Sequence, residues 1–81
     1  MKLTLMFRPY CGLCHQMRDA LQPYLAEYRA ELEIVEIDDF PDLEAKYNEL
    51  VPVLLHGEHE ICHWHLDEAA LRAYMEAQAA H

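Results

Sequence analysis

Cys11-Gly12-Leu13-Cys14 lies between an apolar run, residues 3–7, and a long helical pattern. In the first turn of a helix, residues i and i+3 share one face about 5–6 Å apart, which is close enough for a disulfide. The order of strand and then helix would place Cys11 at a helix N-terminus, where unpaired N–H groups and the helix dipole stabilise negative charge. Because the thiolate is the reactive form of cysteine, this position favours thiol chemistry. These four residues therefore predict a dithiol redox site.

The helical pattern that follows the motif extends to Tyr28. Its apolar residues recur every three or four positions, as on one face of a helix, at Leu13, Met17, Leu21, Tyr24, Leu25 and Tyr28. Pro23 falls within the pattern and removes one backbone hydrogen bond. Because the pattern resumes in phase after Pro23, we expect one kinked helix rather than two helices.

Three further strands are indicated after this helix. We expect them at residues 31–37, 51–55 and 59–65. The middle strand is apolar on both faces, as in the centre of a sheet. Gly57-Glu58 predicts a two-residue hairpin turn between the last two strands.

Two further helices complete the predicted fold. Pro41 suits the first turn of a short helix, and Asp67 is a good N-cap for the last helix. The first strand, helix and second strand require a right-handed crossover between parallel strands. We therefore expect an α/β fold of order β-α-β-α-β-β-α, with a four-stranded mixed sheet and helices on both faces, as a single domain over residues 1–81.

The expected pairing across the hairpin predicts where residues 63–65 lie in the sheet. With the expected two-residue turn, facing residues have numbers that sum to 115, so that His63 would face Pro52 and Cys62 would face Val53. Residues 63–65 (His-Trp-His) would then lie at the active-site end of the sheet. An imidazole there could tune the thiols or bind metal; the alternative is a pair of solvent-facing histidines on an edge strand.

Composition narrows the classes of function and partner. The chain has 81 residues, three cysteines and a net charge of −9, from six Lys and Arg against fifteen Asp and Glu. Nucleic acids and anionic membranes bind basic surfaces, so neither is an expected partner. The N-terminal apolar run is too short for a signal peptide, and no run is long enough for a membrane helix. We expect a cytoplasmic monomer, in a compartment where a CxxC pair is catalytic or metal-binding rather than structural.

The element order, the CxxC motif and Val51-Pro52 before the third strand together resemble the thioredoxin superfamily. The short chain and Arg8-Pro9-Tyr10-Cys11 resemble small bacterial glutaredoxin-like proteins in particular. The resemblance covers essentially the whole chain. It implies a thiol-disulfide oxidoreductase without a bound cofactor, whose partner is a disulfide-containing protein or a small thiol, with glutathione as a possible co-substrate.

Each predicted site residue then has a role. Cys11 would be the nucleophile, and Cys14 would be the resolving thiol that attacks the mixed disulfide. Arg8 could stabilise the thiolate or hold a substrate carboxylate, or else be a solvated arginine at a strand end. The resemblance implies further substrate-binding residues: Tyr10, Val51, Pro52 and Asp67. Pro52 would be cis, and Val51 would offer its backbone N–H and C=O to an extended substrate segment.

Departures from the glutaredoxin pattern concern the partner rather than the fold. Gly12 and Leu13 stand where Pro and Tyr are usual, and Leu50 stands where Thr is usual. Residues 63–65 replace a Gly-Gly turn, so that Asp67 alone can be carried over from that segment. We therefore expect weak binding of glutathione.

Three alternatives remain on the sequence alone. Cys11 to His15 also matches the C-x-x-C-H pattern of covalent haem attachment, although the strands do not suit a small helical cytochrome. A metal-binding module could combine Cys11 and Cys14 with a third ligand from Cys62, His63 or His15. The third alternative is a non-catalytic interaction module on the same fold.

Overall fold

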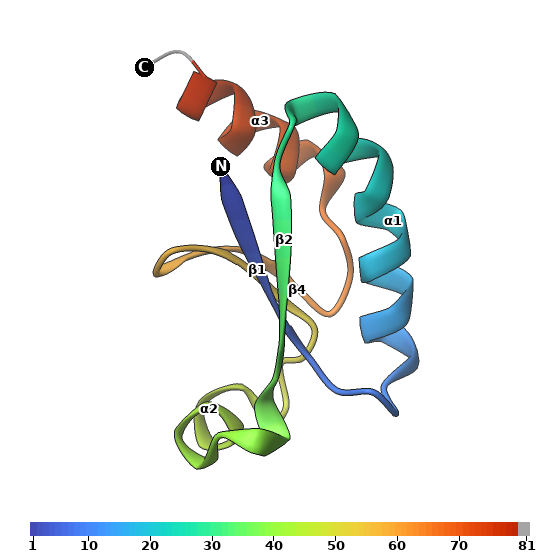
Figure 1. Cartoon of the computed structure of the whole chain (residues 1–81), viewed down its shortest axis with the longest axis vertical. Helices are drawn as coiled ribbons and strands as arrows, with labels where there is room; N and C mark the ends of the chain where they lie inside the picture. Colours follow the sequence, from blue (N-terminus) through green and yellow to red (C-terminus); the bar gives the residue numbers. More distant parts are fainter. Residues whose placement is uncertain (80–81) are drawn as a thin grey trace.

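The computed structural model describes residues 1–79 and contains the predicted order of elements (Figure 1). The strands are β1 (Lys2–Phe7), β2 (Glu31–Glu36), β3 (Val53–His56) and β4 (His59–His63). The helices are α1 (Gly12–Tyr28), the short 3-10 turn η1 (Ile37–Asp39), α2 (Pro41–Tyr47) and α3 (Glu68–Ala79). The predicted α/β fold class is confirmed.

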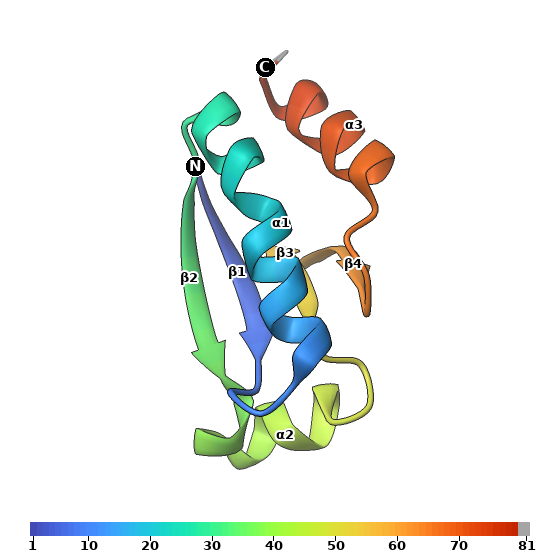
Figure 2. The same ribbon diagram turned by 90° about the vertical axis from the view of Figure 1, so that its right-hand side faces the viewer.

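The four strands form one mixed sheet in the order β2-β1-β3-β4. Strand β1 runs parallel to β2 and antiparallel to β3, and β3 pairs antiparallel with β4. Because β1 and β2 are parallel, their C-terminal ends meet at the same edge of the sheet. The loop that leads into the CxxC motif and the segment of η1 and α2 therefore lie at one end of the molecule (Figure 2).

Helix α1 runs without a break from Gly12 to Tyr28, so the prediction of a single helix through Pro23 is confirmed. Its buried residues, Cys14, Met17 and Leu21, lie on the predicted face toward the sheet. The helix ends where Arg29 adopts a left-handed conformation with φ of 53°, a common way to close the last turn.

Two apolar clusters cover the two faces of the sheet, with α1 and α3 on one side and α2 on the other (Figure 1). The main cluster consists of Leu3, Leu5, Phe7, Cys14, Met17, Leu21, Leu54, Cys62, Leu71 and Met75. The second cluster consists of Met6, Ile37, Tyr47, Val53 and Leu55. The central strands β1 and β3 contribute to both clusters, as expected for strands that are apolar on both faces.

The predicted register of the hairpin is wrong by one residue at its far end. His56 faces His59 and Leu55 faces Glu60, as the sum of 115 predicts, but Leu54 faces Cys62. A β-bulge at this point leaves Ile61 as an extra residue, and beyond it Val53, rather than Pro52, faces His63. Hydropathy could not reveal the bulge because residues 61 and 62 are both apolar. Its consequence is that the Cys62 side chain lies in the main cluster with Cys14.

Three strands are shorter than predicted. Strand β2 ends at Glu36 because the chain turns into η1, and β3 begins two residues later than expected, after Pro52, which has no N–H to donate. Strand β4 ends at His63 because Trp64 adopts a left-handed backbone conformation with φ of 66°.

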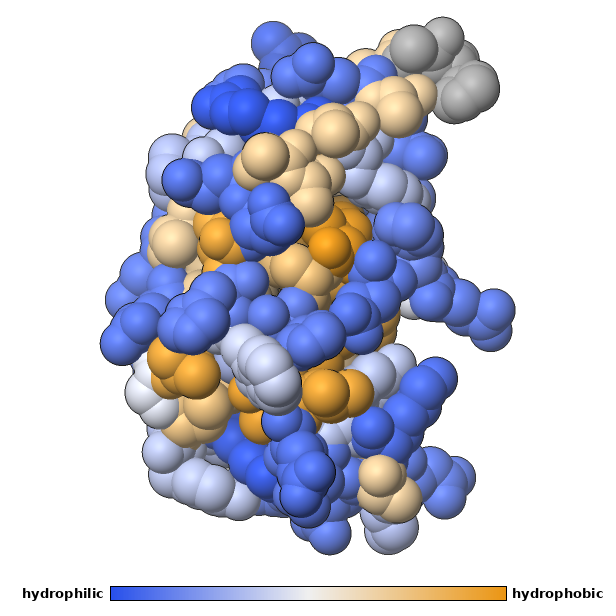
Figure 3. All heavy atoms as spheres, turned by 180° about the vertical axis from the view of Figure 1, so that it is seen from behind, coloured by the Kyte–Doolittle hydropathy of each residue, from blue (hydrophilic) through white to orange (hydrophobic). Residues whose placement is uncertain are grey.

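The surface is mostly hydrophilic on the face turned away from the viewer in Figure 1, with apolar patches separated by polar side chains (Figure 3). Two large apolar side chains at the CxxC end of the sheet are half-exposed or more: Tyr10 at 74% and Phe40 at 50%. No helix among residues 1–79 is both long enough and apolar enough to cross a membrane.

Candidate active site

Cys11 is the N-cap of α1, as the sequence predicts. Its backbone is extended, and its sulfur accepts a hydrogen bond from the backbone N–H of Cys14 at 3.2 Å. The Cys11 N–H in turn donates to the Arg8 carbonyl at 3.1 Å, which holds the preceding loop. The side chain is partly exposed, so that a substrate can approach a sulfur that lies at the positive end of the helix dipole.

Cys14 lies one turn further along α1 and is fully buried. Burial, together with a hydrogen bond to the Cys11 side chain, raises the pKa of Cys14 to about 12. Both effects favour the protonated thiol because a buried thiolate would lose its hydration. The two cysteines therefore occupy unequal environments, one open to substrate and the other a protonated thiol in the core.

Arg8 is bound at each of its three guanidinium nitrogens. Nε donates to Asp38 Oδ1 at 2.8 Å, Nη1 donates to the Asn48 carbonyl at 3.1 Å, and Nη2 donates to Asn48 Oδ1 at 2.7 Å. Only 14% of the Arg8 side chain is exposed. The alternative of a solvated arginine at a strand end is therefore wrong. A substrate carboxylate would have to share with Asp38 a guanidinium that already uses three of its five N–H donors.

Tyr10 shares the acidic partner of Arg8. Its hydroxyl donates to Asp38 Oδ2 at 2.6 Å, while most of the ring remains in solvent. The pKa of Asp38 is lowered because Tyr10 and then Arg8 donate hydrogen bonds to the carboxylate. Asp38 thus joins the loop before Cys11 to the end of β2.

The peptide bond between Val51 and Pro52 is cis, and Pro52 is buried. The Pro52 carbonyl accepts a hydrogen bond from the Trp64 N–H at 2.9 Å. The expected role of Val51 needs a correction, because its N–H already donates to the Tyr47 carbonyl at 3.2 Å. The Val51 carbonyl is left as the group that a substrate segment could use.

Trp64 takes the place where the glutaredoxin pattern has glycine. Its φ of 66° lies in the left-handed region that glycine adopts most readily, and its indole N–H donates to the Glu49 carbonyl at 2.8 Å. Residues 63–65 therefore lie close to the Val51–Pro52 segment, as predicted, although through the backbone of Trp64 rather than a pairing of His63 with Pro52.

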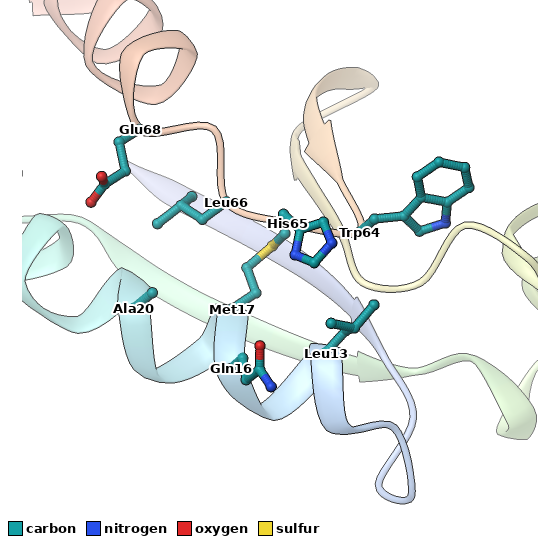
Figure 4. Close-up of a pocket in the computed structure, with 8 residues that line it drawn as sticks. All are labelled: Leu13, Gln16, Met17, Ala20, Trp64, His65, Leu66 and Glu68. Carbon is teal, nitrogen blue, oxygen red and sulfur yellow. The ribbon is translucent and has the colours of Figure 1, made fainter.

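A hollow of about 250 Å³ lies between α1 and the segment that joins β4 to α3 (Figure 4). It is lined by Leu13, Gln16, Met17, Ala20, Trp64, His65, Leu66 and Glu68. The Met17 side chain extends toward His65, whereas the indole of Trp64 points away from α1 (Figure 4).

Asp67 does not line this hollow. Its Oδ1 accepts a hydrogen bond from the Ala70 N–H at 2.9 Å, which confirms the predicted N-cap of α3. The structure therefore brings together Cys11, Cys14, Arg8 and Tyr10 but leaves the Asp67 carboxylate at the start of α3.

His15 contacts the turn that precedes Cys11. His15 Nε2 donates to the Pro9 carbonyl at 2.6 Å, and the ring packs edge-on against Phe7. These contacts hold the turn before Cys11.

Among residues 1–79, no group of three or more His, Cys, Asp or Glu side chains is arranged to hold a metal ion. The ligand sets considered from the sequence do not assemble.

Comparison with known families matches residues 2–76 to the Glutaredoxin-like domain (DUF836). This chain belongs to that family. In this glutaredoxin-like protein, the residues matched to the family include all the described strands and most of α3. No functionally curated protein matches the sequence.

Three solved structures are similar to this chain over most of its length. Protein Ne2328 from Nitrosomonas europaea is 36% identical, with a TM-score of 0.80 over 90% of this chain and 88% of that one. Protein XcR50 from X. campestris is 39% identical, with a TM-score of 0.71 over 93% of this chain and 96% of that one. The germline-specific thioredoxin Deadhead from Drosophila is 18% identical, with a TM-score of 0.57 over 95% of this chain and 78% of that one, a likeness of fold alone.

Two residues of the glutaredoxin-like site were missed by reasoning from the sequence. These residues are Asp38 and Asn48, neither of which belongs to a recognised motif. A signal for Asp38 was present, because Phe7 pairs with Glu36 in the parallel strands and the residues that follow each strand must then lie close together. The contacts of Asn48 depend on how α2 packs, which no local pattern specifies.

Proposed function

We propose that this protein is a thiol-disulfide oxidoreductase in which Cys11 is the nucleophile and Cys14 the resolving thiol. The observation that carries the proposal is the unequal setting of the two cysteines. Cys11 is partly exposed and caps α1, whereas Cys14 is buried and protonated, and its N–H contacts the Cys11 sulfur at 3.2 Å. The partly exposed Cys11 is therefore suited to attack a substrate disulfide, and the buried Cys14 is suited to resolve the mixed disulfide.

The reaction consists of two exchanges. The Cys11 thiolate attacks one sulfur of a substrate disulfide, the S–S bond breaks, and the other sulfur leaves as a thiolate that takes a proton. The Cys14 thiol then loses its proton to solvent and attacks the Cys11 sulfur. The second substrate thiol leaves, and a Cys11–Cys14 disulfide remains. The substrate gains two electrons and two protons.

The oxidised protein must be reduced again by a second thiol reagent. A dithiol protein or two molecules of a small thiol would supply the two electrons through the reverse exchanges. We propose disulfide-containing proteins or small thiols as partners, no resident cofactor, and a cytoplasmic monomer. The match to the Glutaredoxin-like domain supports the thiol-disulfide chemistry of this proposal.

Glutathione is proposed to be a poor partner. The positive charge of Arg8 is already paired with Asp38, and two further N–H donors bind Asn48, which weakens any attraction to a substrate carboxylate. Trp64 places a bulky side chain where a glycine would allow close backbone approach to the tripeptide. Both observations disfavour the contacts that a glutathione site needs.

Equilibration with glutathione buffers of varied ratio, followed by acid quench and intact mass, tests the reaction. The wild type is expected to form a Cys11–Cys14 disulfide, the Cys14→Ser variant a mixed disulfide on Cys11, and the Cys11→Ser variant neither. Cys62→Ser is the matched control and is expected to behave as the wild type. Absence of the Cys11–Cys14 disulfide at every ratio would overturn the proposal.

A second measurement decides whether the mechanism needs both thiols. The Cys14→Ser variant is offered a glutathione mixed disulfide with excess glutathione, and turnover is followed. Slow turnover is expected because the resolving thiol is missing and glutathione binds poorly. Turnover as fast as that of the wild type would instead identify a monothiol glutaredoxin.

A further inference from the structure

We propose that Asp38 makes the CxxC site selective for cationic disulfide substrates by neutralising Arg8. The inference rests on the proposed function and names the substrate class of the same site. Asp38 acts through Arg8 and is therefore a positioning residue. The structure supports this role through the contacts of the carboxylate, the burial of the guanidinium, and the charges around them.

The contacts of Asp38 use both carboxylate oxygens. Oδ1 accepts from Arg8 Nε at 2.8 Å, and Oδ2 accepts from the Tyr10 hydroxyl at 2.6 Å. Asn48 takes the remaining guanidinium nitrogens through its backbone carbonyl and its side-chain oxygen. Arg8 therefore has no nitrogen without a protein partner.

Burial makes this arrangement difficult to rearrange when a substrate arrives. The side chain of Arg8 is 14% exposed and that of Asp38 is 33% exposed. A carboxylate on an incoming substrate would have to compete with Asp38 for a guanidinium that already uses three of its five N–H donors. The negative charge of the substrate would then lie close to the negative charge of Asp38. An anionic substrate thus gains little from the arginine three positions before Cys11.

The carboxylates near Asp38 also disfavour anionic substrates, and they act over a longer range. Residues 36–49 contain six carboxylates and one lysine, Lys46. Glu44 lies close enough to act electrostatically on both Arg8 and Tyr10. With Arg8 already paired, these carboxylates outnumber Lys46, and we expect a negative field at the end of the sheet near Cys11. Such a field accelerates the approach of cations and slows that of anions, and salt weakens it beyond about 8–10 Å.

The substrate that fits this environment is a disulfide whose neighbouring groups are ammonium or guanidinium ions, as in a cysteine flanked by Lys or Arg. Its attack by Cys11 follows the exchange described above, with the same mixed disulfide and the same leaving thiolate. Asp38 changes the rate of encounter and the stability of the mixed disulfide rather than the bonds that form and break.

Three small symmetrical disulfides of different charge test the inference. Cystamine is cationic, bis(2-hydroxyethyl) disulfide is neutral, and 3,3′-dithiodipropionate is anionic. The second-order rate of modification of Cys11 in the reduced protein is measured by quenched mass spectrometry at low and high salt. The wild type is expected to prefer cystamine over the dianion by about tenfold at low ionic strength, with the preference falling toward unity in 0.5 M salt, about the range that screening allows.

Variants then separate the charge of Asp38 from the net charge of the protein. Asp38→Asn is expected to reduce the cation-to-anion rate ratio about threefold or more, and Asp38→Glu to restore most of it. Asp42→Asn removes one charge from α2 and is the matched control, with little expected change in the ratio. Circular dichroism verifies that each variant is folded, and if Asp38→Asn is not, the salt dependence of the wild type still tests the inference.

Each contrary outcome has a defined meaning. Equal reductions in Asp38→Asn and Asp42→Asn would overturn the role of Asp38, as would a uniform loss of rate for all three disulfides, which would indicate a purely structural contact. A wild type that reacts faster with the dianion, or whose ratio is unaffected by salt, would also overturn it. No reaction with the neutral disulfide would instead overturn the proposed function and the selectivity with it.

Discussion

The backbone N–H of Cys14 donates a hydrogen bond to the sulfur of Cys11 across 3.2 Å. In an ordinary helix an Asp or Ser oxygen takes this position as the N-cap acceptor, and here a sulfur does. The sulfur that caps α1 is also the one proposed to attack substrate disulfides, so the cap sets the position of the nucleophile. The start of α1 and the placement of the Cys11 sulfur thus depend on one contact.

Limited alkylation should modify Cys11 before the other two cysteines. Cys11 is partly exposed, whereas Cys14 is fully buried and Cys62 is 9% exposed. Burial also raises the pKa of the Cys62 thiol, so less of its reactive form is present at neutral pH. Peptide mass spectrometry after a substoichiometric dose of iodoacetamide measures the order. Unfolded protein, in which all three should react alike, is the control, and preferential labelling of Cys62 would contradict the assignment.

The reduced protein should lose stability as the pH rises above about 8.5, the ordinary pKa of an unfolded cysteine. Burial raises the pKa of Cys14 to about 12 in the folded state, so between these values the folded state keeps a proton that the unfolded state releases. The free energy of unfolding should therefore fall by up to about 1.4 kcal/mol per pH unit.

Urea unfolding between pH 7 and 10 measures this dependence. The oxidised protein is the matched control because its Cys11–Cys14 disulfide cannot titrate, and its stability should fall less steeply. Parallel curves for the reduced and oxidised forms would show that Cys14 is not the group responsible.

Replacement of Trp64 should distinguish backbone strain from side-chain contacts. At φ of 66°, a residue other than glycine costs roughly 1–2 kcal/mol, which glycine would relieve. Both Trp64→Gly and Trp64→Ala lose the hydrogen bond to the Glu49 carbonyl, worth about 0.5–1.5 kcal/mol. We expect Trp64→Gly to be close to wild type in its free energy of unfolding and Trp64→Ala to be about 1 kcal/mol less stable than the glycine variant.

The same two variants test access for glutathione. Trp64→Gly should react faster than the wild type with glutathione disulfide, because the glycine backbone permits closer approach. A glycine variant that is both less stable than the alanine variant and no more reactive would contradict the role given to Trp64.

Acid should weaken the contact that joins Asp38 to the loop before Cys11. The pKa of Asp38 is lowered by hydrogen bonds from Tyr10 and Arg8, so its contribution to stability is present above about pH 4 and is lost as the pH falls through the lower folded-state value. Urea unfolding measured from pH 5 to pH 2 gives the free energy of unfolding at each pH. This free energy should fall less with decreasing pH for Asp38→Asn than for the wild type. Asp42→Asn, which lacks these contacts, should retain the wild-type slope.

Local patterns were sufficient for the order of elements and for the position of the cysteine pair. An apolar strand, a CxxC motif and a spacing of three and four place Cys11 at a helix start, because strand and helix periodicity depend on neighbours in sequence. The cap at Asp67 was predictable for the same reason, since its bond reaches only to Ala70.

The tertiary structure decided the surroundings of the cysteines. Arg8 binds Asp38 and Asn48 at separations of 30 and 40 residues, and the bulge at Ile61 places Cys62 in the main apolar cluster, which also contains Cys14. Trp64 takes a left-handed conformation that its own sequence does not favour, because its N–H meets the Pro52 carbonyl and its indole meets Glu49. Each of these contacts depends on how strands pair and α2 packs, and no stretch of neighbouring residues contains both partners.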